Sequence, residues 1–314
     1  MKHIFIINPN SGRKRKRSKL INLLTKECQD AGISWEIYYT DRIRAAEDFV
    51  RKTASGGEKL RFYACGGDGT LSEVANGAFG FPNVEVAAIP SGTGNDFCRN
   101  FSDSDAFQDI GRLIRGSIME VDVIRYNDRC AVNAVNIGFD CAIVNLVDKL
   151  RKLPFMGGPS SYTICSFLML LKFPKTTHTI YYPDGRTEKR CVLLNVIANG
   201  SYCGGGFCST PMSNMCDGQF ELLIADGVIK RMGFLRMVGS YKDGSLPDKP
   251  WLDRGTVTVE QLTRLRITND KPFNICVDGD ISTVKEVDFE LVPKGLRFVV
   301  PEGVTVGNSQ TTKY

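Results

Sequence analysis

The chain has 314 residues, of which 42% are hydrophobic and 24% are charged, and its formal net charge is +5. This composition is typical of a globular protein, and the length favours two domains over one. The longest apolar run, ICSFLMLL at residues 164–171, is far shorter than the roughly 20 residues that a membrane span needs. The apolar run at residues 4–7 is too short for a signal peptide, so the sequence predicts a cytoplasmic protein.

Histidine chemistry has little support, because the only two histidines, His3 and His178, are interpreted as residues that fill their strands. A general base would therefore be a carboxylate, and a metal would be a hard, oxygen-bound ion such as Mg²⁺. The eleven cysteines are scattered, and the loose group Cys203, Cys208 and Cys216 matches no usual zinc spacing. We expect reduced, mostly buried thiols.

Strand-like apolar runs alternate with segments of helical period in the first part of the chain. The runs lie at residues 2–7, 33–39, 60–65 and 84–89. The first helical segment repeats apolar residues at intervals of three and four, and a stop signal follows it at Gly32. The repeating residues are Leu20, Leu23, Leu24 and Cys28. This alternation predicts a parallel sheet flanked by helices, with ligands bound where strands end and helices begin.

The pattern changes after residue 126. Residues 177–200 predict two strands around an Asp184-Gly185 turn. Further strand-like runs lie at residues 219–225, 256–268, 273–277 and 286–300, and helical patches lie at 141–152, 159–173 and 230–241. The predicted fold class is α/β plus β, with a parallel-sheet domain at residues 1–126 and a mainly antiparallel β domain with a few helices at residues 127–294.

A glycine-rich stretch, CGGDGTLSE at residues 65–73, follows the third strand-like run. Its glycines let the backbone bend sharply and let a ligand come close. Thr70 and Glu73 form a capping box, which predicts a helix that opens on this loop and offers phosphate oxygens its positive end. The alternative is a tight turn with a solvated Asp68, since a carboxylate next to a phosphate needs Mg²⁺ or a proton between them.

Two neighbouring strand ends carry similar loops, NPNSG at residues 8–12 and PSGTGND at residues 90–96. In a parallel sheet all three loops come out on one edge, where together they could wrap a triphosphate. The spacings of the Rossmann, Walker and protein-kinase phosphate loops are all absent. The sequence therefore predicts a nucleotide site of a less common kind.

The order of motifs resembles the diacylglycerol kinase catalytic family, and more narrowly its soluble bacterial lipid kinases, which are similar to sphingosine kinases. The motifs are NPNSG, GGDGT, PSGTGNDFCR, VNIGFD, ANGSYCGGG, CDGQFEL and VDGD. The resemblance runs from about residue 4 to about residue 300. It implies an ATP-binding first domain, a β-rich lipid-substrate domain, and a return of residues 295–314 onto the first domain. Between the domains, the γ-phosphoryl of ATP would pass to a lipid hydroxyl.

The resemblance also implies roles for single residues. Asp278 matches the general base, while Asp68, Asp217 and Asp280 belong to the Mg²⁺ network, with Asp68 and Asp217 also counted as catalytic. The residues expected to bind the nucleotide are Asn8, Ser11, Gly66, Gly67, Gly69, Thr70, Glu73, Gly92, Thr93, Gly94 and Asn95.

This chain departs from the family pattern at three positions. Asp280 stands where the family usually has glutamate, so an ion held there would need a water molecule or a small backbone shift. Lys14 replaces a common glycine, and Ser213 replaces a common alanine before Asp217. The first departure bears on the geometry of magnesium binding.

A cationic cluster, RKRKRSK at residues 13–19, lies at the start of a predicted helix, where the helix dipole disfavours positive charge. We interpret it as a docking site for an anionic membrane at the inner face of the cell, with a solvated basic face and nucleic acid as alternatives. The modest net charge and the lack of an aromatic-rich basic module argue against nucleic acid. The docking residues are Arg13, Lys14, Arg15, Lys16, Arg17 and Arg99, helped by Arg151, Lys152 and Lys172.

The acceptor lipid and the oligomeric state, a homodimer included, are left open by the sequence. Diacylglycerol, which would give phosphatidic acid, is the acceptor that the resemblance favours. The alternatives are a kinase of a soluble acceptor, like NAD kinase, and a non-catalytic protein that binds a nucleotide or a lipid. The apolar segment 162–171 is interpreted either as the mouth of an acyl-chain cavity or as a buried helix.

Overall fold

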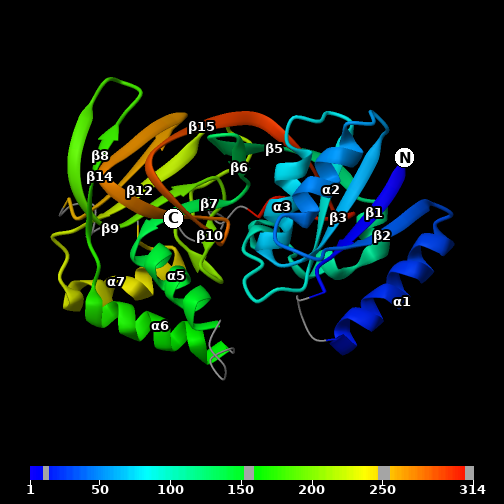
Figure 1. Cartoon of the computed structure of the whole chain (residues 1–314), viewed down its shortest axis with the longest axis horizontal. Coiled ribbons are helices and arrows are strands. Elements are labelled where there is room, and N and C mark those ends of the chain that lie inside the picture. The colour runs from blue at the N-terminus through cyan, green and yellow to red at the C-terminus, as the bar shows by residue number, and fades with distance from the viewer. Residues whose placement is uncertain (10–13, 152–158, 247–254, 308–314) are drawn as a thin grey trace.

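The first part of the chain forms the predicted parallel sheet, in the order β4-β3-β1-β2. The computed structural model describes residues 1–9, 14–151, 159–246 and 255–307. Figure 1 shows this part in blue and cyan, with its helices packed against the strands. Its elements are β1 (Lys2–Ile7), α1 (Lys14–Asp30), β2 (Ser34–Tyr39), α2 (Ala45–Ala54), β3 (Leu60–Gly66), α3 (Asp68–Ala78), β4 (Val84–Pro90), η1 (Phe97–Asn100), η2 (Asp105–Gln108) and α4 (Ile110–Ile114).

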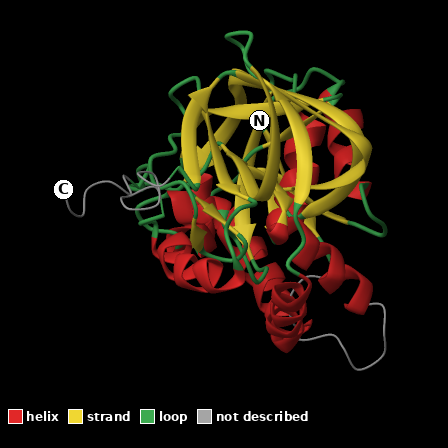
Figure 2. Cartoon of the chain, turned by 90° about the vertical axis from the view of Figure 1, so that its left-hand side faces the viewer, coloured by secondary structure: helices red, strands yellow, loops and turns green. Residues whose placement is uncertain are grey.

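The second part is mainly antiparallel, as predicted, and its strands form a curved sheet with helices below it (Figure 2). Its strands are β5 (Ser117–Tyr126), β6 (Arg129–Ala131), β7 (Ala134–Gly138), β8 (Thr176–Tyr181), β9 (Thr187–Ala198), β10 (Tyr202–Cys203), β11 (Phe207–Cys208), β12 (Phe220–Asp226), β13 (Val257–Leu262), β14 (Arg264–Val277) and β15 (Asp280–Val300). Its helices are α5 (Phe139–Arg151), α6 (Pro159–Lys172) and α7 (Arg231–Asp243). All three helical patches of the sequence are confirmed.

The long strand β15 joins the two parts into one thirteen-stranded sheet. It pairs antiparallel with β14 and β5, and near its end it pairs parallel with β4, where Phe298 lies opposite Val86. Residues 296–304 contribute to the same hydrophobic core as β1, β3 and β4. Because a single sheet runs through both parts, the limits of the two domains at residues 126 and 294 stay a prediction.

The β14–β15 hairpin turns at Asp278 and Gly279, which have φ angles of +47° and +94°. Val277 pairs with Asp280 directly across this two-residue turn. Positive φ at both central positions is the geometry of the tight hairpin turns that Asp-Gly favours. Asp278 is therefore a turn residue as well as a candidate base, and β15 begins at Asp280 rather than at the predicted residue 286.

Every cysteine is unpaired, and nine of the eleven are buried, which agrees with the expected reduced thiols. No helix within the described ranges is long and apolar enough to cross a membrane.

A buried aspartate, Asp122 of β5, fixes two other segments of the second part of the chain. Its carboxylate accepts hydrogen bonds from the backbone N–H of Gly218 and of Lys294, each at 2.8 Å. Its own N–H donates to the carbonyl of Met215 at 2.7 Å. The side chain is 2% exposed. Asp122 thus fixes the turn around residue 218 and the last third of β15 to strand β5.

We expect Asp122→Ala to lower the free energy of unfolding by about 2–4 kcal/mol, because two buried backbone donors would lose their acceptor. Urea denaturation followed by circular dichroism measures this change. The exposed Asp41→Ala serves as the control and should change stability by less than about 0.5 kcal/mol. Equal stability of the two variants would show that the hydrogen bonds of Asp122 to the 218 turn and to β15 do not stabilise the fold.

Candidate active site

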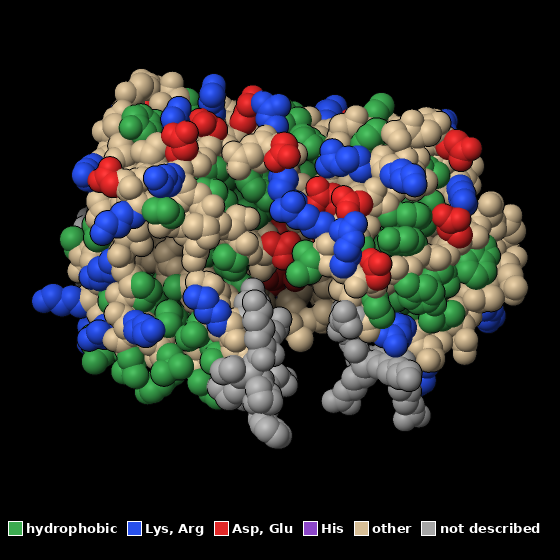
Figure 3. All heavy atoms as spheres, viewed as in Figure 1, with side chains coloured by type: hydrophobic (Ala, Val, Ile, Leu, Met, Phe, Trp, Pro, Cys, Tyr) green, Lys and Arg blue, Asp and Glu red, His purple; other side chains and the backbone are tan. Residues whose placement is uncertain are grey.

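A cavity of about 890 Å³ opens between the two parts of the chain. Figure 3 shows acidic side chains in a hollow near the middle of the molecule. The loops after β3 and β4 line the cavity on one side. The connection before β7, helix α5, the β10–β11 ribbon and the β14–β15 turn line it on the other. The cavity therefore lies at the edge that the sequence predicted for the ligand.

The loops after β3 and β4 touch backbone to backbone. A Cβ atom added to Gly92 would lie 2.6 Å from the Cα of Gly67, and one added to Gly66 would lie 2.1 Å from Oγ1 of Thr70. Gly92 cannot carry a side chain unless the two loops move apart, and Gly66 cannot carry one unless Thr70 shifts. The close approach leaves the N-terminus of α3 without a side-chain cap, so its backbone N–H groups remain available to an anion.

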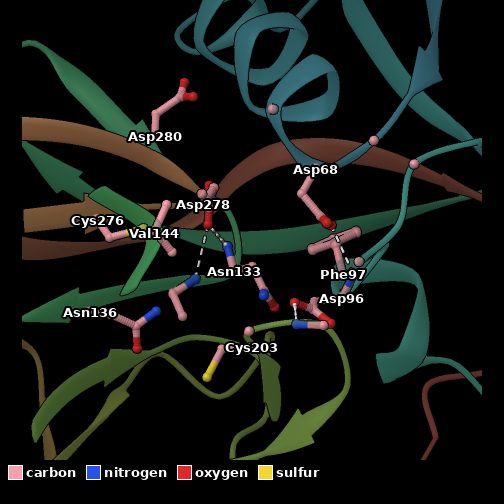
Figure 4. Close-up of a pocket in the computed structure, with 18 of the residues that line it drawn as sticks. Asp68, Asp96, Phe97, Asn133, Asn136, Val144, Cys203, Cys276, Asp278 and Asp280 are labelled. Carbon is pink, nitrogen blue, oxygen red and sulfur yellow. Dashed lines mark hydrogen bonds between the residues drawn. The ribbon is translucent and has the colours of Figure 1, made fainter. Parts of the chain in front are cut away.

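The Asp68 carboxylate holds these loops together by two hydrogen bonds, and Figure 4 shows the one from Asp96 as a dashed line. Its oxygens accept hydrogen bonds from the N–H of Asn95 at 2.7 Å and of Asp96 at 2.8 Å. Burial raises the pKa of Asp68, and the backbone donors oppose that rise. A Cβ added to Gly94 would lie 2.7 Å from the Asp68 carboxylate. In this structure, the hydrogen bonds of Asp68 therefore fix the conformation of the loop after β4.

Asn95 shapes the same loop from within. It has a φ of +53°, and its amide exchanges two hydrogen bonds of 3.1 Å with the backbone of Gly92. Of the residues predicted to bind the nucleotide, those that line the cavity are Gly67, Gly69, Gly92, Thr93 and Gly94. Gly66, Thr70 and Asn95 support the loops from behind. Asn8 lies at the end of β1, and Ser11 lies outside the described residues.

The role predicted for Glu73 is wrong in one respect, because it forms no capping box with Thr70. Its carboxylate accepts hydrogen bonds from the N–H of Arg44 at 2.9 Å and of Ala46 at 3.1 Å. Glu73 therefore caps α2, the neighbouring helix, and it does not line the cavity. The spacing of a capping box was present in the sequence, but the packing of α2 on α3 gave the glutamate a different partner.

Asp96, which the sequence analysis passed over, links the two sides of the cavity. One oxygen accepts a hydrogen bond from the N–H of Gly205 at 2.8 Å, and the other lies 3.6 Å from the Arg99 guanidinium. Burial raises the pKa of Asp96 to about 6, and the charge of Asp68 adds to the rise. Arg99, predicted to dock on a membrane, also donates to the carbonyl of Gly94 at 3.2 Å. Arg99 thus contacts two residues that line the cavity, Gly94 and Asp96.

Asp278 is held by three consecutive backbone N–H groups on the far side of the cavity from Asp68 (Figure 4). Its Oδ2 accepts from Val132 at 2.8 Å, and its Oδ1 accepts from Asn133 at 3.1 Å and Ala134 at 3.0 Å. Burial nevertheless raises its pKa to about 6. A carboxylate with that pKa is mostly ionised at neutral pH and still basic enough to take a proton.

A further carboxylate, Asp140 in the first turn of α5, lines the same cavity. It accepts a hydrogen bond of 2.6 Å from the hydroxyl of Tyr241, which also lies 3.3 Å from the sulfur of Cys203. Burial raises the pKa of Asp140 to about 6, against the effect of the Tyr241 hydroxyl. The sequence signal for this residue was its place at the end of the VNIGFD motif, directly before a helical patch.

The two other predicted acidic residues lie at different distances from the cavity. Asp280 lines it, and its carboxylate would lie 3.9 Å from a Cβ added to Gly69. Figure 4 shows this carboxylate turned away from Asp278. Asp217 does not line the cavity and accepts a hydrogen bond from the N–H of Gln219 within its own turn. Burial raises the pKa of Asp217, and the nearby Asp122 carboxylate contributes to the rise.

The cavity is thus lined by several carboxylates, which are Asp68, Asp96, Asp140, Asp278 and Asp280. A nucleotide triphosphate would be repelled by them unless cations lay between. In the part of the chain that the structure describes, no three His, Cys, Asp or Glu side chains could together hold a metal ion. The carboxylates that line the cavity nevertheless fit Mg²⁺, because this ion is commonly bound by only one or two carboxylates together with substrate phosphates and water.

Most of the predicted docking cluster lies outside what the structure describes. Arg13 and Lys152 are outside the described residues, and the side chains of Lys14, Arg15, Lys16 and Arg151 are not described either. Arg17 donates a hydrogen bond to the carbonyl of Pro9. Lys172 is exposed at the end of α6.

Comparison with known families assigns the chain to a class of enzyme. Residues 2–126 match the family model of the diacylglycerol kinase catalytic domain, and residues 133–300 match that of the YegS C-terminal NAD kinase beta sandwich-like domain. The chain belongs to the diacylglycerol kinase family of lipid kinases. It is thus an enzyme that phosphorylates an alcohol group.

Individual relatives support the same assignment. The chain is 27% identical over 302 residues to a diacylglycerol kinase of Staphylococcus epidermidis, which covers 95% of this chain and 92% of that protein. It is 24% identical over 261 residues to a probable lipid kinase YegS-like of Alcanivorax borkumensis, covering 82% and 84%. A crystal structure of a diacylglycerol kinase from Bacillus anthracis has a TM-score of 0.69 at 18% identity, covering 97% and 98%. This last likeness shows a common fold.

We expect Asp68→Asn to loosen the loop after β4, because an amide offers only one oxygen to the two backbone donors and brings an N–H group against them. Hydrogen exchange followed by mass spectrometry should show at least tenfold faster exchange at Asn95 and Asp96. Asp280→Asn, which changes another carboxylate of the cavity on a different segment, the β14–β15 turn, is the control. Unchanged exchange in Asp68→Asn would show that the carboxylate does not hold the loop.

Proposed function

We propose that this kinase transfers the γ-phosphoryl group of ATP to the hydroxyl of diacylglycerol and forms phosphatidic acid. The observation that carries the proposal is the placement of Asp278 opposite the glycine loops across one cavity. The loops supply N–H groups and a helix N-terminus for phosphates. The opposite side supplies a base, with apolar side chains beside it.

Asp278 has the contacts that a general base needs. Its Oδ2 accepts only one backbone hydrogen bond, whereas its Oδ1 accepts two. A lipid hydroxyl can therefore donate to Oδ2. As the hydroxyl oxygen forms its bond to the γ-phosphorus, the proton moves to Asp278. The bond between this phosphorus and the bridging oxygen then breaks, and its electron pair stays on ADP.

The acidic cavity needs positive charge, and we propose that Mg²⁺ supplies it, with Asp68 and Asp280 as the residues that would hold it. Mg²⁺ neutralises phosphate charge when bound with ATP. Asp217 lies outside the cavity, so we propose for it a separate structural role near Asp122. The carboxylate of Asp68 also fixes the glycine loops by its backbone hydrogen bonds. Its removal would thus affect both the loop and the ion.

A soluble acceptor is the second candidate, because residues 133–300 match a domain described as NAD kinase beta sandwich-like. The wall of the cavity favours a lipid instead. Val144 and Val147 of α5 and Phe207 of β11 line it beside Asp140. Apolar side chains of this kind would bury part of a hydrocarbon chain and would be left without a partner by a nicotinamide dinucleotide.

The direct test is transfer of the γ-label of ATP, with Mg²⁺, to a panel of lipid acceptors in mixed micelles and to NAD in solution. We expect label in the organic phase, with diacylglycerol as the best acceptor. Label in a monoacylglycerol, a sphingoid base, a ceramide or a polyprenol would keep the lipid kinase and change the acceptor. Label only in an NAD-dependent aqueous product would contradict the proposal.

We expect Asp278→Asn to lower kcat by about 10²–10⁴-fold, because the proton acceptor is lost. ATP affinity, measured by calorimetry, should change less than about threefold, since the glycine loops lie on the opposite side of the cavity. Asp184→Asn is a matched control, because Asp184 also precedes a glycine in a hairpin turn but is exposed and does not line the cavity. Normal turnover in Asp278→Asn would remove Asp278 from the role of base.

The pH dependence of kcat/KM should show the same base. Only the ionised carboxylate accepts a proton, and burial raises the pKa of Asp278 to about 6. The rate should therefore be level above pH 7 and should fall about tenfold per pH unit below pH 6. Asp140→Asn should leave the midpoint of this fall in place. A midpoint that moves with Asp140 would assign the titration to that residue instead.

A further inference from the structure

Helix α6 has two apolar faces, and only one of them is covered. Cys165 and Met169, and Phe173 just after the helix, recur at intervals of four and are buried in the hydrophobic core below the sheet. The outward face consists of Ile164, Phe167, Leu168 and Leu171, with exposed fractions of 43, 61, 38 and 57%. From the sequence, this segment was interpreted either as a buried helix or as the mouth of a cavity. In the structure it is a helix that is buried on one side only.

Helix α7 continues this apolar surface. Phe234, Met237 and Tyr241 are buried, whereas Met232 and Leu235 point outward with 62% and 49% of their surface exposed. Val228, just before the helix, is 69% exposed.

The two helices are joined at their ends. Arg231 donates a hydrogen bond to the carbonyl of Leu171 at 2.7 Å, and the rings of Phe173 and Phe234 lie 5.6 Å apart. We call the outward side chains of both helices the apolar face. It consists of Ile164, Phe167, Leu168, Leu171, Val228, Met232 and Leu235. These are seven of the twelve large hydrophobic side chains exposed in the described residues, so the exposure is concentrated in one place.

Figure 3 shows hydrophobic side chains gathered at the lower left, over α6 and α7. The charged side chains within the two segments that carry the apolar face are all cationic, and the carboxylates of Asp226 and Asp243 lie just outside them. Residues 159–183 and 227–242 contain no aspartate or glutamate. They contain the cations Lys172, Lys175, Lys230, Arg231, Arg236 and Lys242. Within the described ranges, Lys172, Lys230 and Arg236 form no ion pair. Such a surface is complementary to one that is apolar inside and anionic outside.

The apolar face also lies next to the candidate active site. Helix α6 packs on α5, whose Val144 and Val147 line the cavity. In Figure 1, α6 and the start of α1 both lie at the lower side of the molecule, one on each half. A flat surface against this side would meet both halves, with the cationic start of α1 on the first of them.

We propose that the apolar face of α6 and α7 inserts into the hydrocarbon boundary of an anionic bilayer and holds the kinase at the lipid surface. Amphipathic helices with Lys and Arg beside exposed Phe and Leu bind membrane interfaces in this way. A second copy of the chain fits less well, because a two-fold symmetric contact would bring the same unpaired cations against each other. This docking proposal rests on the proposed function in one respect only: the kinase would dock in order to reach a lipid substrate.

The test is flotation with vesicles of equal parts phosphatidylglycerol and phosphatidylcholine. The variant changes Phe167→Gln, Leu171→Gln, Met232→Gln and Leu235→Gln together. Because all four side chains are exposed, circular dichroism and thermal melting should match the original protein. We expect at least a tenfold lower vesicle partition coefficient. Ile43→Gln is the control, since Ile43 is 84% exposed on the other half of the chain, and it should leave binding unchanged.

A charge variant tests the second part of the proposal. Lys230→Ser with Arg236→Ser should weaken binding to these vesicles by on the order of fivefold per cation, and added salt should weaken it further. Flotation of the four-glutamine variant like the original protein would overturn the proposal. So would an original protein that does not float but self-associates through this face in sedimentation velocity.

Activity on two acceptors separates this proposal from the proposed function. Dioctanoylglycerol dissolved as monomers reaches the cavity without a membrane, so the four-glutamine variant should phosphorylate it at the original rate. The same variant should lose at least tenfold in rate on long-chain diacylglycerol in vesicles. If neither acceptor is labelled by any form of the protein, the proposed function fails, while flotation still decides the docking face.

Discussion

Four aspartates fix the loops and turns around the cleft of this kinase by accepting hydrogen bonds from backbone N–H groups of other segments, and one of them, Asp96, joins the two sides of the cleft. Asp68 binds the loop at residues 95–96, Asp96 binds Gly205, and Asp278 binds residues 132–134. Asp122 binds the turn at residue 218 and strand β15 from behind. Hydrogen bonds to an ionised acceptor are among the stronger ones in proteins, so each of these carboxylates stabilises the position of the segment that donates to it.

This use of carboxylates links stability to catalysis. Burial raises the pKa of Asp96 and Asp278 to about 6, because their charges are poorly solvated even with backbone donors around them. The unfavourable burial of these charges occurs in the cavity, where a carboxylate can serve as a base or bind a cation. The turn at Asp278 and Gly279 adds to this arrangement, since positive φ at both residues projects the carboxylate from the end of a hairpin into the cleft.

Much of the fold could be predicted from local patterns. The parallel strands and the three later helices followed from apolar period and from stop signals, because these depend on neighbouring residues alone. Strands β5 and β7 were missed. Strand β7, residues 134–138, is a short apolar run of only five residues in the middle of the sheet. Strand β5 carries Asp122, and a charged residue argues against a buried strand unless its hydrogen-bond partners at residues 218 and 294 are known.

The sequence by itself determined the glycine loops and the order of the motifs, and the family resemblance of those motifs implied Asp68, Asp278 and Asp280 as site residues. These depend on residue type and spacing, which are local and are read directly along the chain. Only the tertiary structure decided what each carboxylate contacts. It moved Glu73 to the cap of α2, placed Asp217 outside the cavity, and brought Asp96 and Asp140 into it. It also left one face of α6 uncovered. Such assignments depend on which distant segments meet when the sheet closes, and no short stretch of sequence contains that information.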